Sequence, residues 1–193
     1  MPRARSGLQE IHIAILGMNG VGKSALTVKY ITRRYITEYD PNLEDTYCKH
    51  EIIDSNEYMI WIMDTVEGPN RDPARYLSWA DVFLVVYSVT SLQSLHYAEM
   101  LLRQMSQQEH SLKLRDHVKC LVGTKCDLER YRQVSKADGA QVANLHGAQF
   151  YETCSTEGYN IVKPLDRTPQ SAGASAVAVA TQLFQRLGDA NAT

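Results

Sequence analysis

One run of eight residues constrains the fold of this chain more than any other feature. Residues 17–24 read Gly-Met-Asn-Gly-Val-Gly-Lys-Ser and match the pattern G-x-x-x-x-G-K-[ST]. The glycines let backbone N–H groups wrap around a polyphosphate, and the positive N-terminal end of a following helix faces the same anion. Residues 11–16 are mostly apolar, as in a buried strand, and residues 24–34 have helical apolar spacing. The run therefore predicts a strand, a phosphate-binding loop and a helix. The alternative, a glycine-rich turn with an incidental lysine, is disfavoured by this context.

The rest of the chain alternates strand and helix patterns. Strands are expected from the apolar runs at residues 82–86, 118–122 and 150–153, and a hairpin from 47–53 and 58–63 around a turn at 54–57. Helices are expected at residues 92–108, 137–145 and 174–187. This order predicts an α/β fold of the P-loop NTPase type, with a mostly parallel six-stranded sheet and helices on both faces. Ligands of such sheets bind at the carboxyl ends of the strands, here just after Leu16, Met63, Val122 and Thr153.

Composition narrows the class of protein further. The chain has 193 residues and a formal net charge of -2, which suits one globular domain and gives no sign of nucleic-acid binding. No apolar run is long enough to cross a bilayer, and the start lacks a signal peptide and a myristoylation glycine. The four cysteines do not have zinc-site spacing. We expect a cytoplasmic monomer with reduced thiols.

A second short motif indicates which base the nucleotide carries. Residues 124–127 read Thr-Lys-Cys-Asp and follow the expected strand at 118–122. A carboxylate there can accept hydrogen bonds from the ring N–H and the exocyclic amine of guanine, a donor pair that adenine lacks. Alone the motif is weak, because an exposed Lys/Asp loop is the alternative. Its place in the order of motifs makes it specific: the phosphate loop, residues 39–47 (Tyr-Asp-Pro-Asn-Leu-Glu-Asp-Thr-Tyr), Asp64-Thr65, this motif, and then Glu152-Thr153-Cys154-Ser155.

With this order of motifs, the sequence resembles Ras-superfamily small GTPases over residues 11–156, and residues 39–47 are similar to the effector loop of the atypical Ras-like family-twelve group. The resemblance implies a domain that binds GTP or GDP with Mg²⁺. It also implies that Asp40–Tyr47 form switch I and contact an effector protein; a solvated acidic loop is the alternative. The implied nucleotide contacts are Gly17, Met18, Asn19, Gly20, Val21, Gly22, Lys23, Ser24, Ala25, Asp64, Thr124, Lys125, Asp127, Leu128, Cys154, Ser155 and Thr156, and the implied magnesium ligands are Ser24, Asn42 and Asp64.

Four departures from the family pattern fall near the γ-phosphate. Asn19 replaces the usual glycine and crowds the space of an arginine finger and of the attacking water. Asn42 replaces the threonine of switch I. Where the family reads D-T-A-G-Q, residues 64–68 read Asp-Thr-Val-Glu-Gly, so Glu67 replaces a glycine and Gly68 stands where a glutamine orients water. In the alternative register Gly68 is that glycine, but the loop is then one residue longer and still lacks the glutamine.

These departures predict slow chemistry. Lys23 and Gly68 are the expected catalytic positions: Lys23 still neutralises phosphate charge, whereas Gly68 has no side chain to orient water. An arginine finger contributes about 10³–10⁵ in rate where it can act. We expect nucleotide binding with very slow intrinsic GTP hydrolysis and little response to a Ras-type activating protein. The alternative is a catalytically dead pseudo-GTPase that acts as a nucleotide-stabilised binding module. A small kinase is disfavoured because Asp127 stands at the guanine position.

The chain divides into three expected parts. Residues 1–10 form a leader, residues 11–160 form the guanine-nucleotide domain, and residues 161–193 form a divergent segment that contains the helix at 174–187. The last residues carry no prenylation cysteine and no polybasic run, so we expect no stable membrane anchor. The sequence leaves open whether the helix at 174–187 covers the sheet. Residues 131–134 are expected to form a solvated turn.

Overall fold

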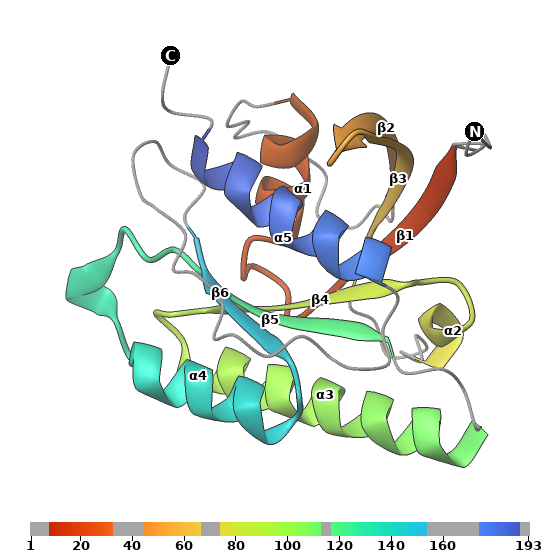
Figure 1. The fold of residues 1–193 in the computed structure, drawn as a ribbon. Helices are drawn as coiled ribbons and strands as arrows, with labels where there is room; N and C mark the ends of the chain where they lie inside the picture. Colours follow the sequence, from red (N-terminus) through yellow and green to blue (C-terminus); the bar gives the residue numbers. More distant parts are fainter. Residues whose placement is uncertain (1–7, 33–44, 67–73, 113–116, 154–173, 190–193) are drawn as a thin grey trace.

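Six strands form one sheet in the order β2-β3-β1-β4-β5-β6 (Figure 1). The structure is a computed structural model that describes residues 8–32, 45–66, 74–112, 117–153 and 174–189. The strands are β1 (Gln9–Leu16), β2 (Asp45–Ile53), β3 (Asn56–Asp64), β4 (Val82–Ser88), β5 (Val118–Thr124) and β6 (Gln149–Glu152). Only the β2–β3 pair is antiparallel among the strand pairs of this described sheet. The predicted mostly parallel sheet is confirmed.

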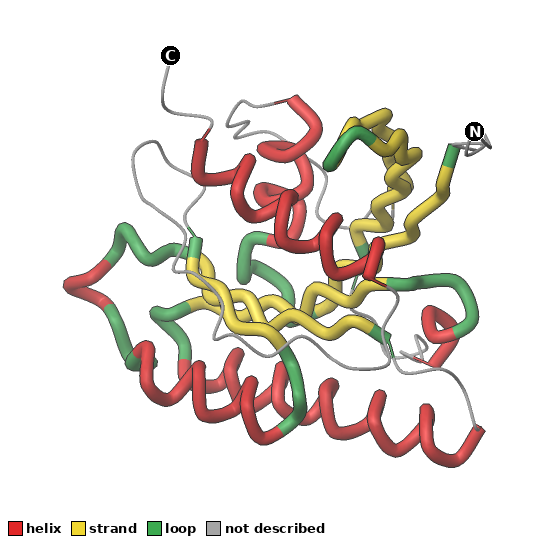
Figure 2. Tube along the Cα trace, in the orientation of Figure 1, coloured by secondary structure: helices red, strands yellow, loops and turns green. Residues whose placement is uncertain are grey.

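Helices cover both faces of this sheet (Figures 1 and 2). They are α1 (Lys23–Thr32), α2 (Ala74–Leu77), α3 (Leu92–Leu112), the 3-10 helix η1 (Glu129–Tyr131), α4 (Lys136–Leu145) and α5 (Ala174–Asp189). Along β1, the side chains of Ile11, Ile13 and Ile15 pack with α1 and α5, whereas Ala14 and Leu16 pack with α3. This alternation follows from the two-residue period of a strand, and both faces are apolar because both are covered.

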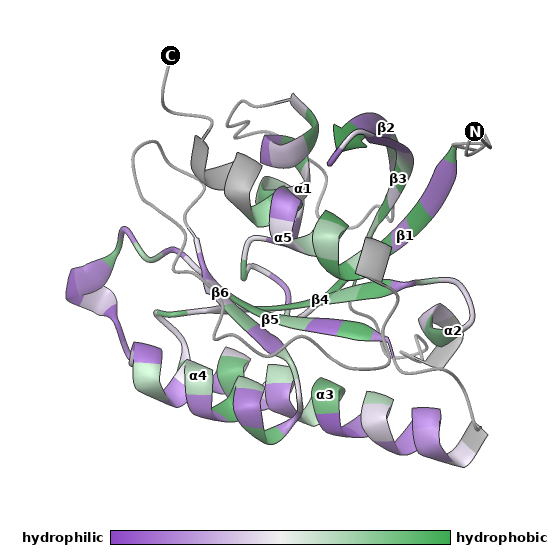
Figure 3. Ribbon diagram, in the orientation of Figure 1, coloured by the Kyte–Doolittle hydropathy of each residue, from purple (hydrophilic) through white to green (hydrophobic). Residues whose placement is uncertain are grey.

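The strand β4 lies at the centre of the core. All seven of its residues are buried, and Figure 3 shows it as mainly apolar, while α3 and α4 alternate apolar and polar segments. The helix α5 closes the other face, because Phe184 stacks on Tyr151 of β6 with ring centroids 3.9 Å apart. Its buried residues recur at helical spacing, as in Ala176, Val179, Ala180 and Leu183. The helix at the end of the described chain therefore covers the sheet.

The structure differs from the expectations in four local features. The hairpin turn is shorter than predicted, with two residues, Asp54 and Ser55, at φ of 48° and 65°. The helix α3 continues to Leu112. Neither α2 nor η1 was predicted; both are too short to produce a hydrophobic period.

The expectation of a solvated turn at residues 131–134 is wrong for two of its four residues. The Arg132 side chain is 13% exposed and Val134 is fully buried. The backbone N–H groups of Gln133 and Val134 both donate to the carbonyl of Val89. The segment therefore packs against the end of β4. Its polar sequence concealed this, because the half-buried Arg132 side chain is paired with the buried carboxylate of Glu152. Within the described ranges, the structure contains no helix that is both long and apolar enough to cross a membrane.

Candidate functional site

The loop between β1 and α1 has the backbone that the glycine pattern predicts. Gly17 has φ of 142° and Gly22 has φ of 105°, a region that side-chain-bearing residues rarely adopt. A Cβ atom on Gly17 would also overlap the carbonyl oxygen of Val86 in β4. Glycine is thus required here by backbone conformation and by close packing, and the loop ends where α1 begins at Lys23.

The ammonium group of Lys23 lies inside this loop. Its Nζ donates hydrogen bonds to the carbonyls of Gly17 at 2.8 Å and Met18 at 3.0 Å, and the residue is buried. Loop carbonyls hold the positive charge at the N-terminal end of α1, where the helix itself favours anions. The site therefore presents a fixed cation to any phosphate bound in the loop.

A second group of polar atoms lies at the carboxyl end of β3. Asp64 is buried, and it accepts a hydrogen bond from the Ser24 side chain at the start of α1. Burial raises the pKa of Asp64 above its ordinary value, although the Ser24 hydrogen bond and the charge of Lys23 oppose this shift. The Oδ1 atom of Asp64 has no hydrogen-bond partner among the described residues. An unpartnered carboxylate oxygen beside a hydroxyl fits Mg²⁺, which prefers oxygen ligands and keeps positions for phosphates and water.

The guanine motif at the end of β5 is joined to the phosphate loop by two side chains. The Thr124 hydroxyl lies within hydrogen-bonding distance of the carbonyls of Val21 and Tyr87. The Nζ of Lys125 donates to the carbonyl of Gly20 at 2.7 Å. Thr124 and Lys125, both predicted nucleotide contacts, therefore support the loop as well as the motif.

The remaining described positions vary in exposure. Asp127 is half-buried, and Leu128 is 41% exposed. Val21 is buried in the core below the loop, so only its backbone can face a ligand. Five predicted site residues lie outside the described residues: Asn42, Gly68, Cys154, Ser155 and Thr156.

The strand register explains why these segments meet. Parallel pairing puts Ile15 opposite Asp64, and it puts Gly123 opposite both Tyr87 and Glu152. The carboxyl ends of β1, β3, β4, β5 and β6 therefore share one edge of the sheet. This edge is the place at which the sequence predicted ligand binding.

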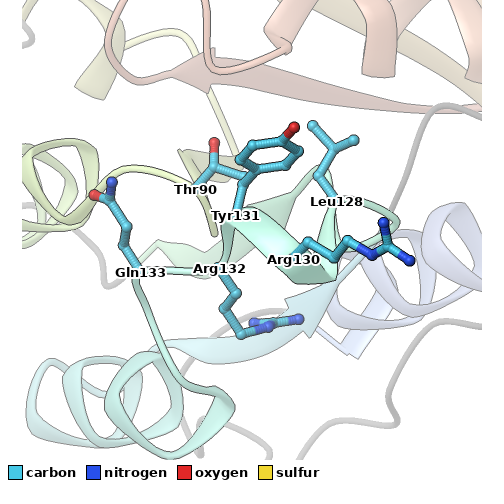
Figure 4. A pocket seen from close by; sticks show the side chains of 6 residues that line it. All are labelled: Thr90, Leu128, Arg130, Tyr131, Arg132 and Gln133. Carbon is cyan, nitrogen blue, oxygen red and sulfur yellow. The ribbon is translucent and has the colours of Figure 1, made fainter.

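Two features near the guanine motif were not anticipated. The first is a surface hollow of about 540 Å³ lined by Thr90, Leu128, Arg130, Tyr131, Arg132 and Gln133 (Figure 4). The second is the ion pair between Arg132 and Glu152. Figure 4 shows the Arg132 side chain on the opposite side of its segment from Tyr131 and Leu128. No sequence pattern indicates this pair, because its members are 20 residues apart and belong to different elements.

Comparison with known proteins gives a consistent result. The family model described as Ras family matches residues 12–172. The chain is 48% identical over 145 residues to Ras-like protein family member 12 of Danio rerio, covering 74% of this chain and 56% of that protein. It is 46% identical over 160 residues to the Homo sapiens protein of that name, with 78% and 58% covered. It is 38% identical over 154 residues to Ras-like protein rasS of Dictyostelium discoideum, with 77% and 76% covered. The chain thus spans little more than half the length of its family-member-12 relatives.

Proposed function

The chain belongs to the Ras family, and on that premise we propose that it is a small GTPase that binds GTP and GDP with Mg²⁺ and hydrolyses GTP slowly. The observation that carries the proposal is the convergence of Lys23, Ser24 and Asp64 at one strand edge. A buried cation, a hydroxyl and an unpartnered carboxylate oxygen are the groups that a metal-bound polyphosphate needs from a protein.

Each of these residues has a defined part in binding. The Lys23 ammonium offsets the charge of the β- and γ-phosphates, and the loop N–H groups of residues 17–22 orient them. Ser24 and Asp64 would hold Mg²⁺, with Asn42 as the further predicted ligand. When bound, the ion neutralises charge that develops on the phosphate oxygens.

The base would be selected by the motif at the end of β5. The Asp127 carboxylate accepts two hydrogen bonds from guanine, whereas adenine would leave it unpaired. Lys125 stays beside the loop through its hydrogen bond to Gly20. Leu128 contributes an apolar side chain next to the motif, and Cys154, Ser155 and Thr156 are the proposed residues of the last base-contacting segment.

Slow hydrolysis follows from the residues that replace the family's water-positioning groups. Gly68 has no side chain to orient the attacking water, and Glu67 adds a negative charge near the γ-phosphate. Asn19 is exposed on the phosphate loop, in the space that an arginine finger would enter. Lys23 still neutralises phosphate charge. We therefore expect the chain to keep its affinity for the nucleotide although it hydrolyses GTP slowly.

The first test identifies the nucleotide that copurifies with the protein. GTP or GDP is expected, and single-turnover GTP hydrolysis should be far slower than that of a Ras protein with the family's glutamine. Hydrolysis at the ordinary Ras rate would contradict the slow-enzyme proposal. GTP binding without any turnover would favour the pseudo-GTPase that acts as a binding module. Bound ATP, or no thermal shift with GDP, would overturn guanine binding altogether.

A second test addresses the base directly. The Asp127→Asn variant should lose GDP affinity and gain affinity for xanthosine diphosphate, because the amide donates where the carboxylate accepts. The exposed Asp54→Asn change on the hairpin turn is the control and should alter neither affinity. Unchanged GDP affinity in the Asp127 variant would remove this residue from the site.

We also propose that Asp40–Tyr47 bind an effector protein. The described end of this segment begins β2, and the Tyr47 hydroxyl donates to the Asp45 carboxylate at 3.3 Å. An acidic loop that leads into an edge strand suits a partner with a basic edge. A monomer in the cytoplasm is the proposed setting, and light scattering of the purified protein tests the monomer.

A further inference from the structure

Arg132 and Glu152 form an ion pair for which the proposed nucleotide chemistry has no use. Nη1 of Arg132 lies 2.8 Å from Oε1 of Glu152, and Nη2 lies 3.1 Å from Oε2. Glu152 is 1% exposed. Two parallel hydrogen bonds between planar groups fix orientation as well as distance. The pair is therefore a rigid link between the two segments that carry it.

Two further N–H groups of Arg132 donate hydrogen bonds within its own segment. Its Nε donates to Oε2 of Glu129 at 2.8 Å, and Nη1 also donates to the carbonyl of Val134 at 3.0 Å. The hydrogen bonds to Glu152 are the main reason that the pKa of Arg132 is raised above its ordinary value. Arg132 thus anchors both ends of its own segment, from η1 to the start of α4.

That segment continues directly from the guanine motif. The chain turns at Cys126 and Asp127, where the Leu128 N–H donates to the Lys125 carbonyl, and the Tyr131 N–H then donates to the Leu128 carbonyl. The Arg132 N–H then donates to the Glu129 carbonyl. Asp127 is therefore connected to Arg132 through successive hydrogen-bonded turns.

Glu152 lies against the beginning of the same motif. A Cβ atom on Gly123 would be 3.2 Å from Cγ of Glu152 and 2.7 Å from the Tyr87 hydroxyl oxygen, so the backbone of β5 is in close contact with both side chains. The next residue, Thr153, donates its N–H to the Gly123 carbonyl at 2.7 Å. The ion pair therefore connects the two sides of the motif, Gly123 before it and Arg132 after it.

We propose that Arg132 and Glu152 are positioning residues for guanine recognition, which hold the Asp127 carboxylate at the place where it meets the base. The inference rests on the proposed function. In the proposed arrangement, neither residue contacts the base. The pair acts by closing the segment from Gly123 to Arg132 into one rigid unit, so that Asp127 does not have to be ordered when the nucleotide binds.

If the ion pair only stabilised the fold, its loss would have a different effect on nucleotide binding. Comparing two ligands distinguishes this structural role from the proposed positioning role. Inosine diphosphate lacks the exocyclic amine of GDP but keeps the ring N–H, so the ratio of their affinities reports the hydrogen bond that Asp127 accepts from that amine. A hydrogen bond to a charged group corresponds to about a 10-fold preference or more for GDP. Loss of stability alone lowers the folded fraction but leaves this ratio unchanged in the folded protein.

The experiment measures both affinities for the full chain and for Arg132→Met and Glu152→Gln. We expect the preference for GDP to fall by about threefold or more in each. Glu129→Gln is the matched control, because it removes only the exposed contact of Arg132, and its preference should equal that of the unmodified chain. Arg132→Lys, which keeps the charge without the two-point geometry, is used if Arg132→Met fails to fold, and it should also lose part of the preference.

The outcomes separate this inference from the proposed function. An unchanged preference in folded Arg132 and Glu152 variants, with a lower unfolding temperature, would show that the pair is structural and overturn the inference alone. An equal loss in Glu129→Gln would do the same, because it would point to a general effect on η1. If the unmodified chain bound neither nucleotide, or bound both equally, the guanine proposal itself would fail.

Discussion

The hydroxyl of Thr124 lies within hydrogen-bonding distance of the carbonyl of Val21, so that the end of β5 is tied to the phosphate loop. The same hydroxyl is 2.9 Å from the carbonyl of Tyr87 at the end of β4. Thr124 was predicted as a guanine contact, and its position adds a structural role to that prediction. One side chain thus joins three segments that converge at the proposed nucleotide.

Thr124→Val should weaken both the fold and nucleotide binding. The change keeps the shape of the side chain but removes the single O–H donor that lies between two carbonyls in a buried place, at a cost of about 1–3 kcal/mol. Urea unfolding measures the loss, and the rate of GDP release should rise. Thr124→Ser keeps the hydroxyl and serves as the control; a similar GDP release rate in both variants would contradict the role of this hydroxyl.

Asp64→Asn should stabilise the metal-free protein while it weakens magnesium-dependent binding. Burial disfavours the ionised carboxylate of Asp64, whose Oδ1 has no partner in the described part of the chain. Replacing it with a neutral amide should raise the free energy of unfolding by about 1 kcal/mol, as for other functional residues that lower stability. Thermal unfolding without nucleotide tests this, and GDP release with and without Mg²⁺ tests the second effect. Equal magnesium dependence in variant and parent would remove Asp64 from the proposed metal site.

A buried charge cluster on the other side of the molecule predicts a pH dependence. Glu109 accepts hydrogen bonds from the His117 ring at 2.7 Å and from the Lys119 ammonium at 2.7 Å. Burial alone raises the pKa of Glu109, yet these hydrogen bonds and the charge of Lys119 outweigh it and hold the pKa below its ordinary value. The stabilisation is therefore present above the unfolded-state pKa and is lost as the pH falls through the lower folded-state pKa.

Glu109→Gln should accordingly destabilise the protein by about 3 kcal/mol at neutral pH, because Lys119 loses its buried partner. The difference from the unmodified chain should shrink near pH 4, where the parent begins to lose the same interaction. Urea unfolding at both pH values measures it. Glu99→Gln is the control. Glu99 lies 3.6 Å from Arg103 and from His146, and this change should lower the free energy of unfolding by less than about 1 kcal/mol. A pH-independent difference would contradict the assigned protonation behaviour.

Two buried tyrosines allow a matched test of how much a hydroxyl group contributes to stability. The Tyr87 hydroxyl has no hydrogen-bond partner within the described part of the chain, whereas the Tyr151 hydroxyl donates to Gln149 at 2.9 Å. Tyr87→Phe should leave stability unchanged or raise it by about 1 kcal/mol, and Tyr151→Phe should lower it by about 1 kcal/mol. Differential scanning calorimetry distinguishes them; a loss of stability in Tyr87→Phe would reveal a partner for its hydroxyl.

Local patterns in the sequence were sufficient for most of the fold. The apolar runs at 82–86 and 118–122 became the buried strands β4 and β5, and the glycine pattern at 17–24 became a loop with positive φ. Such features depend on residues that are close together in the sequence, so a hydrophobic period or a motif indicates them directly. The short elements α2 and η1 have no such period. Tyr76 and Leu77 of α2 pack in the same apolar cluster as α3. The helix η1 has no buried residue, and its Glu129 side chain is held by Arg132.

The sequence by itself determined the chemistry available at the strand edge: a phosphate loop with Lys23 and Ser24, an acidic residue at 64 and a guanine motif ending at Asp127. Only the tertiary structure decided that Arg132 pairs with the buried Glu152 and that Thr124 supports the loop at Val21. These pairs join elements distant along the chain. The order and register of the strands bring these partners together, and no local sequence pattern indicates that order or register.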